Sequence, residues 1–376
     1  MSYSLFRHAG SLVWKRRPIQ LTFFLTSNCN ANCPFCFYLS GKRNDAEKTD
    51  ELTLEEIKKV SASIGNLLWL AFSGGELFLR EDLADIVKVF YKNNKPSIIL
   101  LPTNGLMPEA IREKTEAILK QCRRSTVVVK LSLDGPEEIN DVLRGVKGAF
   151  QKTIATFNEL RPLLKKYRNF ELGINSVFCS KNQDYMKELF SVVHKLEGIR
   201  THTVSLIRGD ISDERLKEID ITKYHDTIAQ MASELDRGVA GVYRFRGARL
   251  KAAQDILQRE LIYKTMMSNK RLLPCYAGRL TLVLTETGDV YPCESFNDRL
   301  GNVRDSGYDI TGLLETEEVR EKIRLIKKGG CFCTHECYLM MNILFNPLMY
   351  PALLKKYLDL RFDLSKIKIR EVLKTS

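Results

Sequence analysis

Three closely spaced cysteines are the strongest chemical feature of the sequence. Cys29, Cys33 and Cys36 follow a short apolar run and share one tight loop. A cubane iron–sulfur cluster normally takes four thiolates, so three thiols can hold three irons and leave the fourth open to an exogenous ligand. A structural zinc site would need a fourth ligand, usually from a second Cys/His pair, and this loop lacks one. The pattern therefore predicts a cluster with one open iron.

The elements that would position this loop are predicted by an alternation along residues 20–220. Short β-rich runs alternate there with helical patterns, and Thr53 with Glu56 forms a capping box at one helix start. The runs are 21–26, 67–73, 97–101, 126–133, 170–177 and 201–207. Most are largely apolar rather than strictly alternating, as strands covered on both faces should be. We predict an α/β fold with a partial (βα)6 TIM-like barrel, whose active site lies at the carboxyl ends of its strands.

Further motifs stand where successive runs end. They are Ser73-Gly74-Gly75-Glu76, Thr103-Asn104-Gly105, Ser132-Leu133-Asp134-Gly135-Pro136, and the segment from Asp141 to Arg144-Gly145. Together with a CxxxCxxC loop that has Phe35 before its last cysteine, this order resembles the radical S-adenosylmethionine (SAM) superfamily.

The resemblance implies a SAM pocket at the mouth of the barrel. The backbone at Gly74, Gly75 and Glu76 would meet the amino group of SAM, because glycines permit close approach. Ser132 and Arg144 would contact the ribose or the carboxylate of SAM. Further candidates for the cofactor pocket are Phe35, Asn104, Asp134, Asn175 and Leu206. Local turn capping or a surface ion pair stays open as the alternative for Ser132 and Arg144, and an ordinary surface acid for Glu76.

The implied reaction is the reductive cleavage of SAM at a [4Fe-4S] cluster held by Cys29, Cys33 and Cys36. It yields a 5′-deoxyadenosyl radical that abstracts hydrogen from an unactivated C–H bond, while the protein fixes geometry and excludes water. An electron donor such as flavodoxin or ferredoxin is the expected partner.

Five cysteines in the last third of the chain predict a second metal site. They are Cys275 and Cys293, which flank a predicted hairpin, and Cys331, Cys333 and Cys337. The arrangement resembles the auxiliary-cluster domains called SPASM and twitch. A full SPASM domain uses about seven cysteines, so one auxiliary [4Fe-4S] cluster held by four of these five fits better. Which thiol is spare stays open, and buried inert cysteines or a zinc site are the alternatives. Cys122 and Cys179 stand apart and are interpreted as packed apolar residues.

The expected organisation has five parts. They are an N-terminal extension (1–19), the partial barrel (20–220), a helical linker (221–270), an auxiliary-cluster domain of the twitch or SPASM type (271–340) and an apolar and basic helical tail (341–376).

Composition and charge indicate the class of protein, the kind of partner and the expected location. The 376 residues are 44% apolar and 28% charged, which is typical of a soluble globular protein. The formal net charge of +12 favours an anionic partner, which could be a nucleotide-like cofactor, a phosphate, an acidic membrane surface or nucleic acid. Residues 1–17 lack a signal-peptide pattern, so we expect a cytoplasmic protein whose clustered cysteines bind metal.

One segment near the end raises the question of a membrane. Residues 337–354 carry no charge, but Pro347 and Pro351 argue against one continuous spanning helix. We predict two short packed or interfacial helices. Peripheral membrane contact, helped by the basic tail 355–374, is the alternative.

The substrate is not identified by these patterns. A peptide, a lipid or isoprenoid and a sugar all remain open, as does whether SAM is consumed or regenerated. The first predicted strand begins near residue 20, which leaves no room for an N-terminal peptide-recognition domain and weakens the peptide hypothesis. A non-enzymatic metal-binding module on nucleic acid is the competing class. It would need a basic helix or paired four-ligand zinc spacing, so no nucleic acid is expected.

Overall fold

One nine-stranded sheet organises the chain. A computed structural model describes residues 2–40, 50–237, 241, 243–245, 247–329 and 331–360. The strands are β1 (Gln20–Thr26), β2 (Trp69–Gly74), β3 (Ile98–Thr103), β4 (Thr126–Ser132), β5 (Phe170–Phe178), β6 (Thr201–Leu206), β7 (Thr281–Leu284), β8 (Asp289–Tyr291) and β9 (Gly301–Asn302). Their order in the sheet is β6-β5-β4-β3-β2-β1-β7-β8-β9. Strands β1 to β6 are parallel, and each overlaps its predicted run, so the predicted partial barrel is confirmed.

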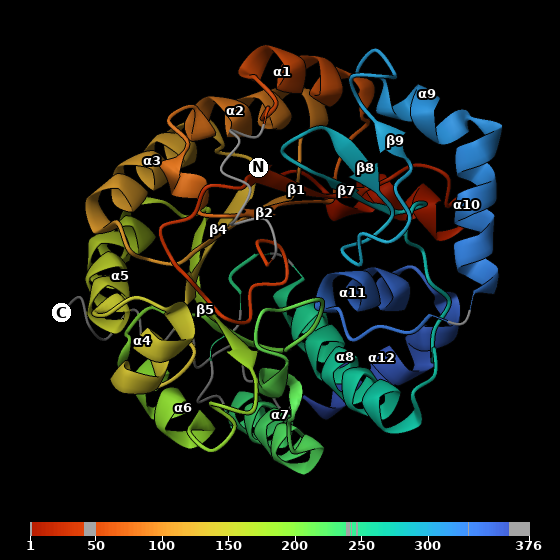
Figure 1. Cartoon of the computed structure of the whole chain (residues 1–376). Coiled ribbons are helices and arrows are strands. Elements are labelled where there is room, and N and C mark those ends of the chain that lie inside the picture. Colours follow the sequence, from red (N-terminus) through yellow and green to blue (C-terminus); the bar gives the residue numbers. More distant parts are fainter. Residues whose placement is uncertain are drawn as a thin grey trace.

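Helices follow the strands and cover the outside of the curved sheet (Figure 1). The α-helices are α1 (Leu54–Ser63), α2 (Leu83–Asn94), α3 (Pro108–Gln121), α4 (Glu137–Arg144), α5 (Ala149–Lys166), α6 (Met186–Lys195), α7 (Ile221–Asp236), α8 (Ala248–Ser268), α9 (Ile310–Glu315), α10 (Glu317–Lys328), α11 (Glu336–Leu344) and α12 (Tyr350–Asp359). Short 3-10 turns are η1 (Leu5–Leu12), η2 (Leu77–Leu79), η3 (Glu214–Lys217) and η4 (Pro347–Met349). The predicted capping box of Thr53 and Glu56 is formed at the start of α1. Figure 1 shows α1 to α6 along the outer arc, whereas α8, α11 and α12 lie on the open side.

Alternation along β4 separates the two faces of the sheet. Val127 and Val129 pack in the main core with the outer helices, whereas Val128 belongs to a second apolar cluster on the inner face. Lys130 and Ser132 share this inner face and line a cavity inside the barrel. The inner face is therefore apolar at the amino end of the strand and polar toward the carboxyl end.

Helix α11 closes the apolar end of the barrel. Its Met340 and Met341 pack with Trp69 of β2 and Val128 of β4 on the inner face. The uncharged stretch thus forms two short helices, as predicted, and the first of them is part of the core. Within the described residues no single helix is long and apolar enough to cross a membrane, although α11 and the η4–α12 segment, bent by 90°, together reach the length and composition of a broken span. The predicted basic tail beyond residue 360 lies outside the described residues.

The predicted hairpin of the cysteine-rich segment extends the barrel sheet. Strand β7 pairs in parallel with β1, with Gln20 opposite Thr281, and β8 and β9 follow as antiparallel neighbours. The sheet is therefore continuous across the expected boundary at residue 271. The four boundaries between the five expected parts stay a prediction.

Candidate functional site

The end of β2 lies against the backbone of the cysteine loop. The Gly75 amide donates to the Thr26 carbonyl oxygen at 2.7 Å, and the Glu76 amide donates to the Asn28 carbonyl oxygen at 2.8 Å. A Cβ on Gly75 would lie 2.0 Å from the Asn28 oxygen, and one on Gly74, whose φ is 114°, would lie 2.5 Å from the Thr26 oxygen. Glycine is therefore required here by the protein's own backbone, independently of any approach by SAM.

Glu76 ties the end of β2 to the loop after β3. One carboxylate oxygen accepts hydrogen bonds from the Thr103 hydroxyl at 2.8 Å and the Phe78 amide at 3.2 Å, and the other accepts from the Asn104 amide at 2.7 Å. The side chain is 1% exposed, and burial raises the pKa of its carboxyl to about 7. The three hydrogen bonds lower the pKa but do not outweigh burial. The alternative of an ordinary surface acid is wrong.

Two N–H donors reach thiols of the cysteine loop. Asn104 Nδ2 lies 3.9 Å from Cys29 Sγ, and Arg144 Nη1 lies 3.8 Å from Cys33 Sγ. Burial raises the pKa of the Cys33 thiol to about 11, and the Arg144 guanidinium opposes that shift. Three thiols with cationic and amide donors beside them suit a cluster of thiolate ligands, whose sulfurs accept such hydrogen bonds.

Arg144 is held in a buried ion pair. It contacts Asp134, and its guanidinium carbon lies 5.3 Å from the centre of the Phe35 ring. The other oxygen of Asp134 accepts from the Val177 amide on β5 at 2.7 Å. Both side chains are under a tenth exposed, so the alternative of a surface ion pair is wrong. This pair fixes the cysteine loop to the ends of β4 and β5.

The predicted SAM residues converge on one cavity of about 360 Å³ at the carboxyl ends of the strands. Its lining includes Cys29, Cys33, Phe35, Cys36, Gly74, Gly75, Glu76, Asn104, Ser132, Arg144, Asn175 and Leu206. Asp134 is outside this lining and contacts it through Arg144. The residues come from β1 to β6 and their loops, which only the sheet brings together.

The five distal cysteines lie in different surroundings. Cys337, in the first turn of α11, lines the same cavity as the cysteine loop. Cys275 and Cys293 are half-buried within one apolar cluster, whereas Cys331 and Cys333 are exposed. In the part of the chain that the structure describes, no three His, Cys, Asp or Glu side chains are grouped as a site for a single metal ion.

Arg208 connects the two cysteine groups, and sequence reasoning missed it. Its guanidinium carbon lies 5.1 Å from the ring centre of Phe37, which follows Cys36. The same group pairs with Glu294 at 3.3 Å and with Glu336 at 3.6 Å, each adjacent to a distal cysteine. An acid beside each of two cysteines was the signal available in the sequence.

A group of charged side chains from β4 and α8 lines the same cavity and was not identified from the sequence. Lys130 lies in the middle of β4, and α8 presents Lys251, Asp255 and Arg259 to the same cavity. The three helix residues are spaced by four, so they share one face. A lysine within an otherwise apolar strand was the clearest sequence signal of this feature.

Known proteins resemble the chain in sequence and in fold. Residues 23–174 match the Radical SAM superfamily. The AdoMet-dependent heme synthase of Methanosarcina barkeri (strain Fusaro / DSM 804) is 27% identical over 328 residues, covering 84% of this chain and 87% of that protein. The antilisterial bacteriocin subtilosin biosynthesis protein AlbA of Bacillus subtilis (strain 168) is 26% identical, covering 78% of this chain and 59% of that protein.

A solved structure supports the same fold. Native anSMEcpe with bound AdoMet superposes with a TM-score of 0.57 at 20% identity, covering 90% of this chain and 97% of that one. The sequence matches and this fold agree with the resemblance inferred from the motifs. Residues 23–174 are a radical SAM domain, and the protein is an enzyme that uses SAM and iron–sulfur chemistry.

Proposed function

We propose that Cys29, Cys33 and Cys36 hold the SAM-binding cluster and that the substrate occupies the cavity beside them. The observation that carries this is that one cavity is lined by all three thiols and also by Cys337 of α11. When bound, the cluster and SAM supply a 5′-deoxyadenosyl radical that abstracts hydrogen from the substrate.

The protein's own part is to hold and enclose the reactants. Glu76 and Arg144 fix the loops around the cysteines through buried contacts, so the thiols keep their relative positions. Helix α11 fills the far end of the barrel and excludes water from that side. Asn175 and Ser132 lie opposite each other in the β4–β5 register and present polar groups to the cavity, where they would orient SAM.

We further propose that four of the five distal cysteines hold one auxiliary [4Fe-4S] cluster, within the segment 271–340. Support comes from Cys275 and Cys293, which belong to one cluster of side chains, and from Arg208, which joins this region to the cysteine loop. Such a cluster would accept an electron or anchor the substrate. Flavodoxin or ferredoxin is the proposed electron donor.

A peptide is the substrate class that we place first. It is supported by the relative AlbA, which is named for the biosynthesis of a bacteriocin. A tetrapyrrole is the second candidate, because the heme synthase relative matches a larger share of both chains. Stimulation of SAM cleavage by a peptide or by an iron porphyrin separates the two.

The test of the proposed function is SAM cleavage by anaerobically reconstituted protein. With dithionite and SAM we expect 5′-deoxyadenosine, measured by liquid chromatography and mass spectrometry. The variant Cys29→Ala/Cys33→Ala/Cys36→Ala should lose at least about 99% of this activity, because the cluster that carries the hard chemistry is gone. Cys122→Ala is the matched control, since Cys122 is buried away from the cavity. Equal activity in the triple variant, or a colourless zinc protein, would overturn the proposal.

We also propose a cytoplasmic location with peripheral membrane contact through the η4–α12 segment. Leu348, Leu354 and Leu358 are 84%, 57% and 66% exposed along this segment. Co-sedimentation with anionic vesicles tests the contact, and full recovery in the supernatant would refute it.

A further inference from the structure

Two cations in the cavity have no acidic partner among the residues that the structure describes. Five cationic side chains line it, and three are paired: Arg144 with Asp134, Arg208 with Glu294, and Lys251 with Asp255. The other two, Lys130 of β4 and Arg259 of α8, make no ion pair with any described residue. Lys130 is buried and Arg259 is partly exposed, so the cost of burying an unpaired charge falls on Lys130, whose position calls for an explanation.

The ammonium group of Lys130 donates hydrogen bonds only to neutral oxygens. It is 5% exposed, and Nζ donates to the Thr201 hydroxyl at 2.5 Å and to the Thr203 hydroxyl at 3.2 Å. Gly173 on the neighbouring strand makes the room, because a Cβ there would lie 2.7 Å from Nζ. Burial lowers the pKa of the ammonium to about 7, and the charge of Asp255 opposes that shift. A long basic side chain is thus kept inside a barrel where a methionine of similar length would cost less.

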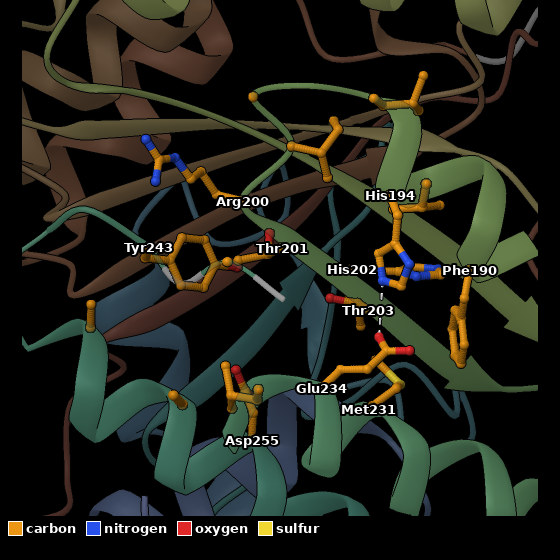
Figure 2. Close-up of a pocket in the computed structure, with 18 of the residues that line it drawn as sticks. Phe190, His194, Arg200, Thr201, His202, Thr203, Met231, Glu234, Tyr243 and Asp255 are labelled. Atoms are coloured by element: carbon orange, nitrogen blue, oxygen red, sulfur yellow. Dashed lines mark hydrogen bonds and ion pairs between the residues drawn. The ribbon is translucent and has the colours of Figure 1, made fainter. Parts of the chain in front are cut away.

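Arg259 stands where two cavities meet. A second cavity, of about 310 Å³, lies between β6 and the helices α7 and α8 (Figure 2). Thr203, Tyr243, Asp255 and Arg259 line both cavities, so the two spaces adjoin at this group. Figure 2 shows Tyr243 from the segment before α8, Thr203 on β6 and Asp255 on α8 around the same space. The junction is therefore the deep end of the space that begins at the cysteine loop.

We propose that Lys130 and Arg259 bind a carboxylate of the substrate at this junction. The inference rests on the proposed function, which puts the substrate in the cavity, and it specifies which chemical group the substrate must carry. An ammonium and a guanidinium from opposite walls can each donate to one carboxylate. Asp255 is engaged by Lys251, so the junction keeps an excess of positive charge. The reacting C–H bond would then lie between this anchor and the cysteine loop, at a distance set by the length of the substrate.

Binding of small aromatic acids tests the proposal without any SAM cleavage. The reconstituted enzyme, with saturating SAM and no reductant, is titrated into 4-fluorobenzoate and followed by fluorine NMR line width. The wild type should bind the acid, and 4-fluorobenzamide, which lacks the charge, should not bind. Phenyl phosphate should bind more weakly than the carboxylate, and tighter binding of phosphate would overturn the assignment to a carboxylate.

Substitutions place the binding at the two cations. Lys130→Met and Arg259→Gln should each weaken binding of 4-fluorobenzoate about tenfold, and the double variant should abolish it. Lys152→Met, on the exposed outer face of α5, is the matched control and should bind like the wild type. Arg259→Gln changes a partly exposed residue and keeps the test decisive if Lys130→Met misfolds.

Failure of this proposal and failure of the proposed function are distinguishable. Unchanged binding in both single variants, or equal binding of the benzamide, would overturn the carboxylate site even in an enzyme that cleaves SAM. Loss of binding in the variants would support the site even if no 5′-deoxyadenosine were formed.

Discussion

Glu76 shows how one side chain joins a motif to the site around it. Its carboxylate accepts three hydrogen bonds, from the last residue of β3, from the loop after β3 and from η2, and it is almost wholly buried. Burial raises its pKa to about 7, so between pH 4.5 and 7 the folded state retains a proton that the unfolded state has released. The contribution of Glu76 to stability therefore falls as pH rises through that window.

A substitution at this residue makes that linkage measurable. Between pH 5 and pH 7.5 the wild type should lose about 1–3 kcal/mol of unfolding free energy as Glu76 ionises, and Glu76→Gln should not. The melting temperature of the variant, relative to the wild type, should therefore rise over this range. Differential scanning fluorimetry across this range measures it. Glu81→Gln is the control, since Glu81 is 93% exposed and should show no such trend. A difference between Glu76→Gln and the wild type that does not change with pH would contradict the linkage.

At the scale of elements, the packing of α11 determines which part of the uncharged stretch 337–354 is buried in the core. Met341 is fully buried and packs against β2 and β4, whereas Leu348, only seven residues further, is 84% exposed in η4. Both side chains are apolar, so hydropathy alone predicts the same burial for Met341 and Leu348. The fold assigns the first to the core and leaves the second at the surface.

Alanine substitutions separate these two roles. Met341→Ala should lower the free energy of unfolding by about 2–4 kcal/mol, because it leaves a cavity at the closed end of the barrel. Leu348→Ala should change it by less than about 0.5 kcal/mol. Urea denaturation of both variants provides the comparison, and equal effects would mean that α11 does not pack as described.

At the scale of the whole molecule, the two cysteine groups belong to one structure. Strand β7 extends the sheet from β1, and Arg208 contacts both Phe37 and Glu294. The distal cysteines are therefore held against the barrel by the sheet and by this arginine. Any cofactor bound by them would lie near the same cavity.

Iron analysis tests this two-site organisation. The reconstituted enzyme should contain about eight irons per chain, for two clusters of four. Cys275→Ala/Cys293→Ala and, separately, Cys29→Ala/Cys33→Ala/Cys36→Ala should each reduce this to about four. Inductively coupled plasma analysis measures the iron. A wild-type content of about four, unchanged by Cys275→Ala/Cys293→Ala, would refute the second cluster.

Local patterns were sufficient for the order of elements. Apolar runs predicted the six strands β1 to β6 because most of their residues are buried on both faces of the sheet. The Thr53–Glu56 capping box formed because it depends on four consecutive residues. The motifs CxxxCxxC and GGE identified the radical SAM domain, since the chemistry of the loop requires those residue types next to each other.

The tertiary structure decided what depends on contacts distant in sequence. Lys130 and Arg259 are 129 positions apart, and nothing local shows that β4 and α8 line one cavity. Arg208, which follows β6, acquires its partners only when the fold brings it to the loop at Glu294 and to the start of α11 at Glu336. The sequence by itself determined that the three cysteines share a loop at the end of a strand. Their enclosure with a second group of cysteines and with the cations of β4 and α8 required the sheet to curve and the helices α8 and α11 to close its open side.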